Sequence, residues 1–284
     1  MRFALSNNLR IEATKGAKGI CPCCATELVA RCGEIKVHHW AHKKKCNDHW
    51  WENETEWHRD WKNKFPKDWQ EIIHKDTVGE KHIADVKTLE DWVVEFQHSP
   101  ISKEERSSRD NFYKKIIWVV DGTRRKTDIR QFKQILNEES RIDKPSKKIL
   151  WVNFAQHNRL LMDWKGSDSL IFIDFKDKLS SNEGLWLIYP NMYKNEIYLS
   201  QFSRNSFINY LNENRFDEIL ENVVNAIRIT VEHSLKKEEK ELDDYYYKHR
   251  NSDLDTMAAA FPGTKNNLLG YLKLPNDILE KIEK

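Results

Sequence analysis

The sequence lacks the features of a membrane or exported protein. No run of apolar side chains in its 284 residues approaches the roughly 20 that a helix needs to cross a bilayer. The opening segment, Met1 to Ser6, shows no extended apolar stretch of the kind found in secretory signals. We therefore expect a cytoplasmic protein that makes no membrane contact.

The chain also lacks a strong net charge. Its formal charge is +2, so composition alone gives no general electrostatic argument for nucleic-acid binding. Basic residues gather only locally, at 43–45, 124–126 and 144–148, and such runs are typical of solvated surface. No internal repeat or low-complexity tract is present. The 39% of hydrophobic residues suits a globular protein with one large domain or two small ones.

Cysteine is scarce, and its five positions are confined to the stretch from Cys21 to Cys46. An odd, clustered set does not suit a disulfide framework and favours metal binding in a cytosolic chain. Cys21 and Cys24 form a C-x-x-C pair, and His39 and His42 form an H-x-x-H pair. Two such pairs supply the four ligands of a tetrahedral structural zinc site. We predict zinc at these four residues, with Cys46 as an alternative to one histidine.

The next segment reads as helix, three strands, helix and strand. The expected elements are a helix over Trp50–Phe65, strands over Trp69–His74, Lys81–Lys87 and Trp92–Gln97, a helix over Ser102–Lys115 and a strand over Ile116–Val120. Pro66 ends the first helix, and Ser102 with Glu105 suits a capping box at the start of the second. This order predicts an α/β fold (α+β), with a mixed sheet and helices packed against it.

The signals weaken in the second half of the chain. Expected there are helices over Thr127–Asn137 and Asp217–Tyr246, strands over Leu150–Phe154, Leu170–Phe175 and Leu185–Tyr189, and a turn over Ser180–Gly184. These elements form either a second strand-plus-helix domain or an extension of the first sheet. We divide the chain into a zinc module (1–48), a core (49–122) and a C-terminal α/β region (123–284). The C-terminal region has no assigned role and is a possible surface for a protein partner.

Two polar residues interrupt an otherwise apolar strand near the middle of the chain. Glu95 and Gln97 share one face of this strand with Val93, because strand side chains alternate. A buried carboxylate is costly unless something binds it. A divalent metal would compensate, with Asp85 on the preceding strand as a second ligand. This arrangement predicts a metal-dependent phosphodiesterase site.

Further candidate residues lie on the two helices beside these strands. Glu54, His58 and Lys62 recur every four residues and line one helix face. Read alone, this is a solvated stripe; read with Asp85 and Glu95, it places a third carboxylate above the strands, with His58 and Lys62 as candidates for substrate binding. Mg²⁺ or Mn²⁺ would be held by such oxygen ligands. Arg109 and Tyr113 are one helical turn apart and either hold a flanking phosphate or pack in the core.

At this point the chain resembles the competence protein CoiA-like family, over roughly residues 15 to 122. The motifs that carry the resemblance are Cys21-Pro22-Cys23-Cys24, His39-Trp40-Ala41-His42, Glu54-Thr55-Glu56-Trp57-His58 with Lys62, Ala84-Asp85-Val86, Glu95-Phe96-Gln97-His98-Ser99 with Ile101-Ser102, and the segment Arg109 to Tyr113. The resemblance implies a zinc-finger-like N-terminal region and a restriction-endonuclease-like core of the PD-(D/E)xK type. It also implies metal ligands at Asp85 and Glu95, with Glu54 as the helix carboxylate.

One position departs from the general superfamily pattern. Gln97 stands where that pattern has a lysine, and a neutral amide can only orient the attacking water by hydrogen bonds. His82, Lys87 or Lys62 would have to supply the missing positive charge. Glutamine at this position is also found in CoiA-like families.

We therefore expect a metal-dependent nuclease that hydrolyses DNA in uptake, recombination, repair or defence, with catalytic Glu54, Asp85, Glu95 and Gln97. The alternatives are a catalytically weak or inactive DNA-binding scaffold with the same fold, and an RNase. Nothing in the sequence distinguishes ribose from deoxyribose substrates.

Overall fold

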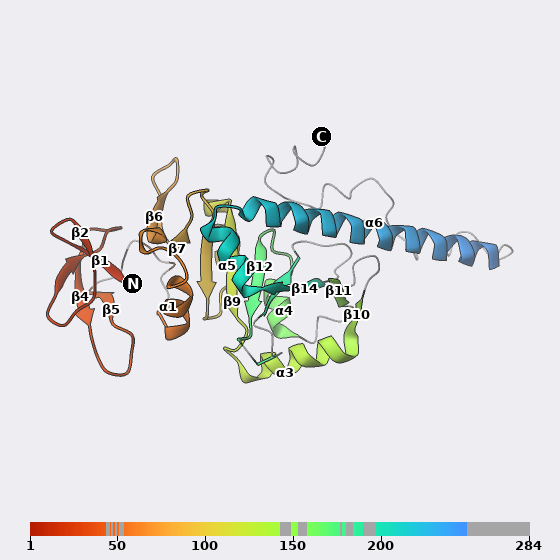
Figure 1. The fold of residues 1–284 in the computed structure, drawn as a ribbon, viewed down its shortest axis with the longest axis horizontal. Coiled ribbons are helices and arrows are strands. Elements are labelled where there is room, and N and C mark those ends of the chain that lie inside the picture. The colour runs from red at the N-terminus through yellow and green to blue at the C-terminus, as the bar shows by residue number, and fades with distance from the viewer. Residues whose placement is uncertain are drawn as a thin grey trace.

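The computed structural model describes residues 1–43, 46, 48, 50, 54–142, 149–152, 158–176, 178–179, 184–189 and 197–248. Within these residues the chain forms two β-sheets and six α-helices (Figure 1). The five-stranded sheet lies at one end of the molecule, beside the edge of the nine-stranded sheet. The predicted α/β fold class is confirmed by this combination of sheets and helices.

The five-stranded sheet is formed by the N-terminal residues and is antiparallel throughout. In the order β2-β1-β3-β4-β5, its strands are β1 (Phe3–Ser6), β2 (Leu9–Glu12), β3 (Lys18–Ile20), β4 (Glu27–Arg31) and β5 (His39–His42). Its small core surrounds the fully buried Trp40. A Cβ at Gly19 would stand 2.7 Å from the Cβ of Ala4 and 3.1 Å from the Trp40 ring, so this position requires glycine.

The nine-stranded sheet has the order β10-β11-β14-β13-β12-β9-β8-β7-β6. Its strands are β6 (Gln70–Lys75), β7 (Lys81–Lys87), β8 (Val93–Gln97), β9 (Ile116–Asp121), β10 (Ser140–Ile142), β11 (Ile149–Val152), β12 (Leu170–Asp174), β13 (Gly184–Ile188) and β14 (Ile197–Ser203). Strands β8, β9 and β12 are mutually parallel, whereas the other neighbouring pairs are antiparallel. The strands after residue 122 therefore extend the same sheet, which was one of the two predicted possibilities.

Helices cover both faces of this sheet. They are α1 (Glu56–Lys62), α2 (Lys103–Tyr113), α3 (Lys126–Gln134), α4 (Arg159–Trp164), α5 (Arg204–Asn212) and α6 (Phe216–Lys248), with a 3-10 turn η1 (Lys67–Trp69) and a π-helical turn η2 (Ile135–Glu139). Helices α1, α5 and α6 contribute to the core on one face, and α2, α3 and α4 to the core on the other. Figure 1 shows α6 and α3 on opposite sides of the sheet, with α6 extending past the sheet edge. No helix in the described part of the chain combines the length and apolar character needed to cross a bilayer.

The predicted elements of the core are present, with shifted boundaries. The first helix is the main difference: α1 begins only at Glu56, after the N-cap Thr55, whose hydroxyl and backbone bond reciprocally with His58. Glu54 consequently precedes the helix instead of lying on its face. The predicted cap of α2 is confirmed, since the Ser102 hydroxyl accepts a bond from the Glu105 amide at 3.1 Å. The predicted turn over 180–184 and the end of the strand over 150–154 lie largely outside the described residues.

The side chains of β8 alternate between the two faces of the sheet, as the sequence predicts. Val94 and Phe96 belong to the core beneath α1, and Val93 belongs to the core beneath α2. All five residues of the strand are buried. Glu95 is therefore a buried carboxylate on a strand that lies between two apolar cores, and its charge requires partners.

One carboxylate ties α1 and α5 to the middle of the sheet. Asp174, at the end of β12, accepts bonds from the indole Nε1 of Trp57 and of Trp61, each at 2.9 Å, through Oδ2. Its Oδ1 accepts a bond from Arg204 on α5. The strand region after residue 122 thus holds the helix that carries Lys62.

We expect Asp174→Ala to lower the free energy of unfolding by about 3–5 kcal/mol, because it leaves the Arg204 charge and two indole N–H groups without their buried acceptor. Urea denaturation would measure the loss. Glu213→Ala, which breaks an exposed ion pair with Arg215, is the control and should cost less than about 1 kcal/mol. Equal losses in the two variants would contradict this role of Asp174.

Candidate functional site

A cysteine–histidine cluster lies where the N-terminal module meets the large sheet. The ligand atoms of Cys21, Cys24, His42 and Cys46 all lie within 4.8 Å of one another. Cys24 Sγ is 3.5 Å from His42 Nε2 and 3.6 Å from Cys46 Sγ. Three sulfurs and one imidazole nitrogen at this spacing match the donor set of a tetrahedral zinc site. The cluster could hold a structural metal such as zinc, as the cysteine spacing predicted.

The structure corrects one of the four predicted ligands, because Cys46 takes the place of His39. His39 and His42 both lie on β5, where positions three apart face opposite sides of the strand. The ring of His39 instead bonds through Nδ1 to the Val37 carbonyl at 2.9 Å. Cys46 was the predicted alternative to one histidine, and the structure shows that it takes the place of His39.

Hydrogen bonding and burial give the thiols of this cluster different pKa values. Burial acts to raise the pKa of Cys24, but bonds from Thr26, Cys21 and His42 outweigh it and lower the pKa to about 6. Burial raises the pKa of Cys21 to about 12. The thiolate needed by a metal therefore forms most readily at Cys24.

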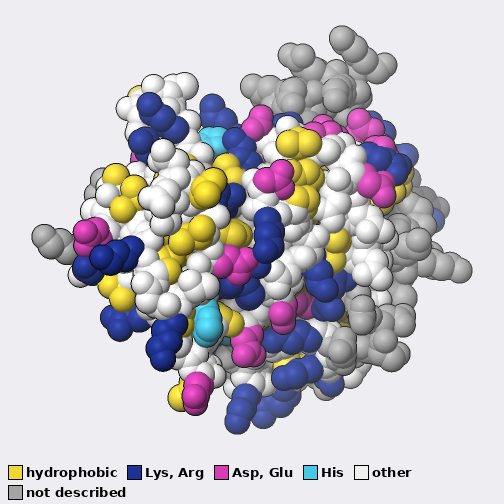
Figure 2. Space-filling model, turned by 60° about the vertical axis from the view of Figure 1, so that its left-hand side comes forward, with side chains coloured by type: hydrophobic (Ala, Val, Ile, Leu, Met, Phe, Trp, Pro, Cys, Tyr) yellow, Lys and Arg dark blue, Asp and Glu magenta, His cyan; other side chains and the backbone are white. Residues whose placement is uncertain are grey.

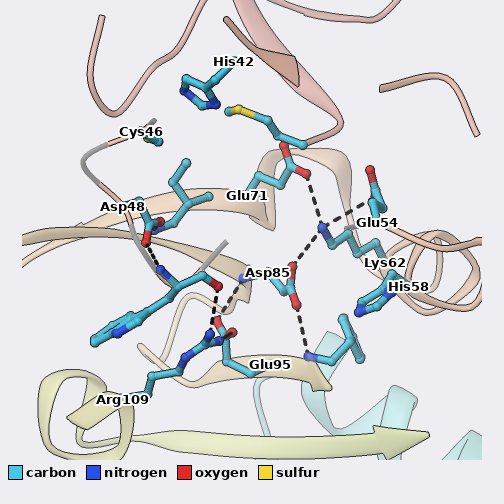
Figure 3. A pocket seen from close by; sticks show the side chains of 14 residues that line it. His42, Cys46, Asp48, Glu54, His58, Lys62, Glu71, Asp85, Glu95 and Arg109 are labelled. Carbon is cyan, nitrogen blue, oxygen red and sulfur yellow. Dashed lines mark hydrogen bonds and ion pairs between the residues drawn. The ribbon is translucent and has the colours of Figure 1, made fainter. Parts of the chain in front are cut away.

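An acidic pocket of about 70 Å³ adjoins the cluster. His42 and Cys46 contribute to its wall together with residues of α1, β6, β7 and β8. The charged or titratable lining residues from the large sheet and its helices are Glu54, His58, Lys62, Glu71, Asp85, Glu95 and Arg109 (Figure 3). The pocket thus brings together most of the predicted site residues.

The Lys62 ammonium occupies the centre of the acidic groups. Its Nζ lies 2.8 Å from Asp85 Oδ1, 3.2 Å from Glu71 Oε1 and 3.5 Å from Glu54 Oε1 (Figure 3). Burial alone would lower the pKa of Lys62, but these three carboxylates raise it well above its usual value. Lys62 is therefore a permanent cation inside the pocket.

Asp85 and Glu95 lie next to each other where β7 and β8 meet. The register of the two strands pairs Val86 with Val94, and Asp85 and Glu95 are the next residues beyond this pair. Each carboxylate also bonds to the neighbouring strand. Glu95 Oε1 accepts from the Asp85 amide at 3.2 Å, and Asp85 Oδ2 accepts from the Phe96 amide at 3.1 Å.

Glu95 differs from the pocket carboxylates Glu54 and Glu71, because its pKa is raised whereas theirs are lowered. Burial and the neighbouring Asp85 raise its pKa to about 8, against the opposing effect of Arg109. Arg109 Nη1 lies 3.1 Å from Glu95 Oε2 and its Nη2 donates to the Trp50 carbonyl at 2.8 Å. Arg109 is buried and holds Glu95 in place.

Sequence reasoning missed Glu71, which lies opposite Asp85 on β6. Its carboxylate accepts bonds from the backbone amides of Arg2 at 2.6 Å and Phe3 at 3.0 Å, in addition to Lys62. Its backbone has a φ of 48°, a left-handed conformation that is uncommon for residues other than glycine. Glu71 therefore docks the N-terminal module onto the pocket. The only sequence signal was a glutamate within a predicted strand, which is equally typical of an exposed position.

The remaining predicted residues lie around the pocket. The Gln97 amide donates to the Ser99 carbonyl at 2.9 Å at the end of β8. Glu54 is bound mainly by Arg59, at 2.8 Å and 3.1 Å. Tyr113 packs in the core beneath α2 and does not line the pocket, which corresponds to the packing alternative.

These features describe a mixed α/β protein whose N-terminal module gathers cysteine and histidine side chains as metal-binding modules do. Residues 6–48 match the family model of the competence protein CoiA N-terminal domain. The predicted resemblance to the CoiA-like family is thereby confirmed through this domain. The match ends before α1 and does not extend to the carboxylates of the pocket. No curated protein and no solved structure gave a significant match to the chain.

The cluster geometry predicts which residues retain a metal. Purified protein should carry about one zinc per chain, measured by elemental analysis, and Cys46→Ser should lower both the zinc content and the melting temperature. His39→Ala is the matched control and should bind as much zinc as the unchanged protein. Loss of zinc in His39→Ala with retention in Cys46→Ser would overturn the ligand set.

The raised pKa of Glu95 predicts a pH-dependent stability difference. Between its ordinary value of 4.5 and about 8, the folded protein holds a proton on Glu95 that the unfolded chain releases, so stability falls as pH rises through this window. Glu95→Gln removes the titration. The free energy of unfolding of Glu95→Gln, relative to that of the unchanged protein, should rise by on the order of 3 kcal/mol between pH 5 and 8. Urea denaturation at a series of pH values would measure this difference. If the difference in free energy of unfolding between the two proteins stays constant from pH 5 to 8, the pKa of Glu95 is not raised.

Proposed function

We propose that this protein is a metal-dependent nuclease that hydrolyses phosphodiester bonds of DNA. The observation that carries the proposal is the pair Asp85 and Glu95, next to each other on adjacent strands, in a pocket that also contains the buried Lys62 ammonium. Two strand carboxylates with a lysine are the groups expected for phosphodiester hydrolysis assisted by a metal. The family model that matches residues 6–48 is named for a competence protein. A competence-related role is therefore part of the proposal.

The order of elements around the pocket supports this function. From α1 to β9 the chain follows helix, three strands, helix, strand, and β8 and β9 are parallel across the α2 crossover. This is the order expected for the restriction-endonuclease-like core that the sequence resembles. The pocket lies where β7 and β8 carry their carboxylates, as that resemblance implies.

The proposal includes a hard divalent cation in the pocket. Mg²⁺ and Mn²⁺ prefer oxygen ligands, commonly one or two carboxylates with water and substrate phosphate. Asp85 and Glu95 would hold the ion, and the Lys62 ammonium beside Asp85 marks a position that already favours positive charge. When bound, such an ion lowers the pKa of a coordinated water and neutralises charge on the phosphate.

The protein's own residues then have separate tasks. Lys62, released in part from its carboxylates, would stabilise negative charge that develops on the phosphate. It would thereby supply the positive charge that Gln97 cannot. Arg109 fixes the orientation of Glu95 through its bond at 3.1 Å, and Glu71 and Glu54 keep Lys62 aimed at the pocket.

A binding protein without catalysis is the second candidate, and one observation favours it. Lys62 and Arg109 already neutralise the two strand carboxylates, and the Gln97 amide is directed to a backbone carbonyl. In this candidate the ion pairs stabilise the fold and DNA binds on the surface.

The role of the C-terminal region in binding a protein partner stays a prediction, since residues 249–284 lie outside the described structure.

Asp85→Asn should reduce DNA cleavage by several orders of magnitude, because it removes a metal ligand while keeping the shape of the side chain. The assay uses linear, circular and single-stranded DNA, and RNA, each with Mg²⁺, Mn²⁺ or EDTA. Asp91→Asn is the matched control, since Asp91 is an exposed carboxylate paired with Lys87, and it should retain activity. Cleavage that persists in Asp85→Asn protein, purified free of other nucleases, would overturn the site proposed at Asp85. DNA binding by the unchanged protein without any cleavage would support the second candidate.

A further inference from the structure

A second group of charged residues lies at the carboxyl ends of the three parallel strands. His98 follows β8, Asp121 ends β9 and Asp174 ends β12, in consecutive register. Ligands of sheets with parallel strands bind outside these carboxyl ends. Asp174 accepts bonds from Trp57, Trp61 and Arg204, as described above, and therefore has a structural role. His98 and Asp121 do not line the pocket, and His98 lies beside the Trp57 and His58 rings of α1.

His98 is held at this edge by a buried carboxylate. Its Nδ1 lies 2.9 Å from Asp121 Oδ2, and Asp121 is itself fixed by bonds from the Thr123 amide at 2.8 Å and hydroxyl at 2.6 Å. The Lys176 ammonium lies 3.8 Å from the same Oδ2. The side chains of His98 and Lys176 are 37% and 43% exposed, whereas that of Asp121 is 2% exposed. The cluster therefore presents its basic groups to solvent and its acid to the interior.

This edge is continuous with the acidic pocket through His58. The His98 ring centroid lies 6.0 Å from that of His58, and His58 lines the pocket one helical turn before Lys62. His98 also shares a strand face with Phe96, another lining residue. Lys62, His58, His98 and Lys176 consequently form a row of nitrogen-bearing side chains that leads from the pocket to the exposed edge.

We propose that His98 and Lys176 bind a backbone phosphate of the DNA strand whose neighbouring phosphate enters the pocket. The inference rests on the proposed function and adds a subsite to it. Phosphate contacts of this kind position a nucleic-acid strand without reading its sequence. The fixed imidazole of His98 supplies a directed donor, and the mobile Lys176 ammonium supplies charge.

The surface charge explains why such a local subsite matters. On the face shown in Figure 2, lysine and arginine side chains are interspersed with aspartate and glutamate, and the net charge of the chain is +2. A uniform positive field therefore does not hold DNA on this protein. Affinity must come from a few placed contacts, and each contact contributes to the salt dependence of binding.

The test is a salt titration of DNA binding by fluorescence anisotropy, with a labelled single-stranded oligonucleotide and its duplex in Ca²⁺. Lys176→Gln should weaken binding and reduce the slope of log K against log salt by about 1, because it removes a cation. His98→Gln should weaken binding through loss of the fixed imidazole donor. Lys178→Gln, an exposed lysine two residues further on, should leave the affinity and the slope unchanged. His98→Arg should restore the affinity lost in His98→Gln, which loss of a purely structural bond would not allow.

The outcomes separate this inference from the proposed function. An affinity equal to that of the unchanged protein in His98→Gln, together with an unchanged slope in Lys176→Gln, would overturn the subsite, even if cleavage still depends on Asp85. Absence of DNA binding by the unchanged protein would overturn both proposals. Because Lys176 is partly exposed and its side chain makes only a long contact, Lys176→Gln tests the subsite without endangering the fold.

Discussion

The placement of the Lys62 ammonium is the interaction on which the rest of the site depends. A buried cation is costly unless carboxylates surround it, and here they come from three separate segments: Glu54 before α1, Glu71 on β6 and Asp85 on β7. Glu71 also binds the backbone of β1. The N-terminal module, the first helix and the edge of the large sheet are thus held around a single positive charge.

The same charge balance controls what else the pocket can bind. Glu95 has a raised pKa because it is buried beside Asp85, so a proton, Arg109 and an incoming cation all compete for it. Under the proposed function, binding of a divalent ion would release the proton from Glu95 and loosen Lys62 from Asp85. The lysine would then be free to act on the phosphate, which links ion binding to the availability of the positive charge.

The C-terminal strands contribute to this site although they are distant in sequence. They continue the sheet beyond β9, and Asp174 on β12 fixes the two tryptophans of α1. The edge formed by β8, β9 and β12 carries His98 and Asp121 next to the pocket. The second half of the chain therefore supports the pocket directly, and its strands complete the surface on which we place the DNA strand.

The sequence by itself determined the features that depend on local periodicity. Alternation along Val93–Gln97 placed Glu95 and Gln97 on one face of a buried strand, and the order of elements placed Asp85 on the adjacent strand. Tertiary structure decided the rest. Cys46 replaced His39 because β5 is extended and turns His39 and His42 to opposite sides. Glu71 and Lys62 became central only through pairing between distant segments, because a buried charge selects its partners by position in space and not by spacing along the chain.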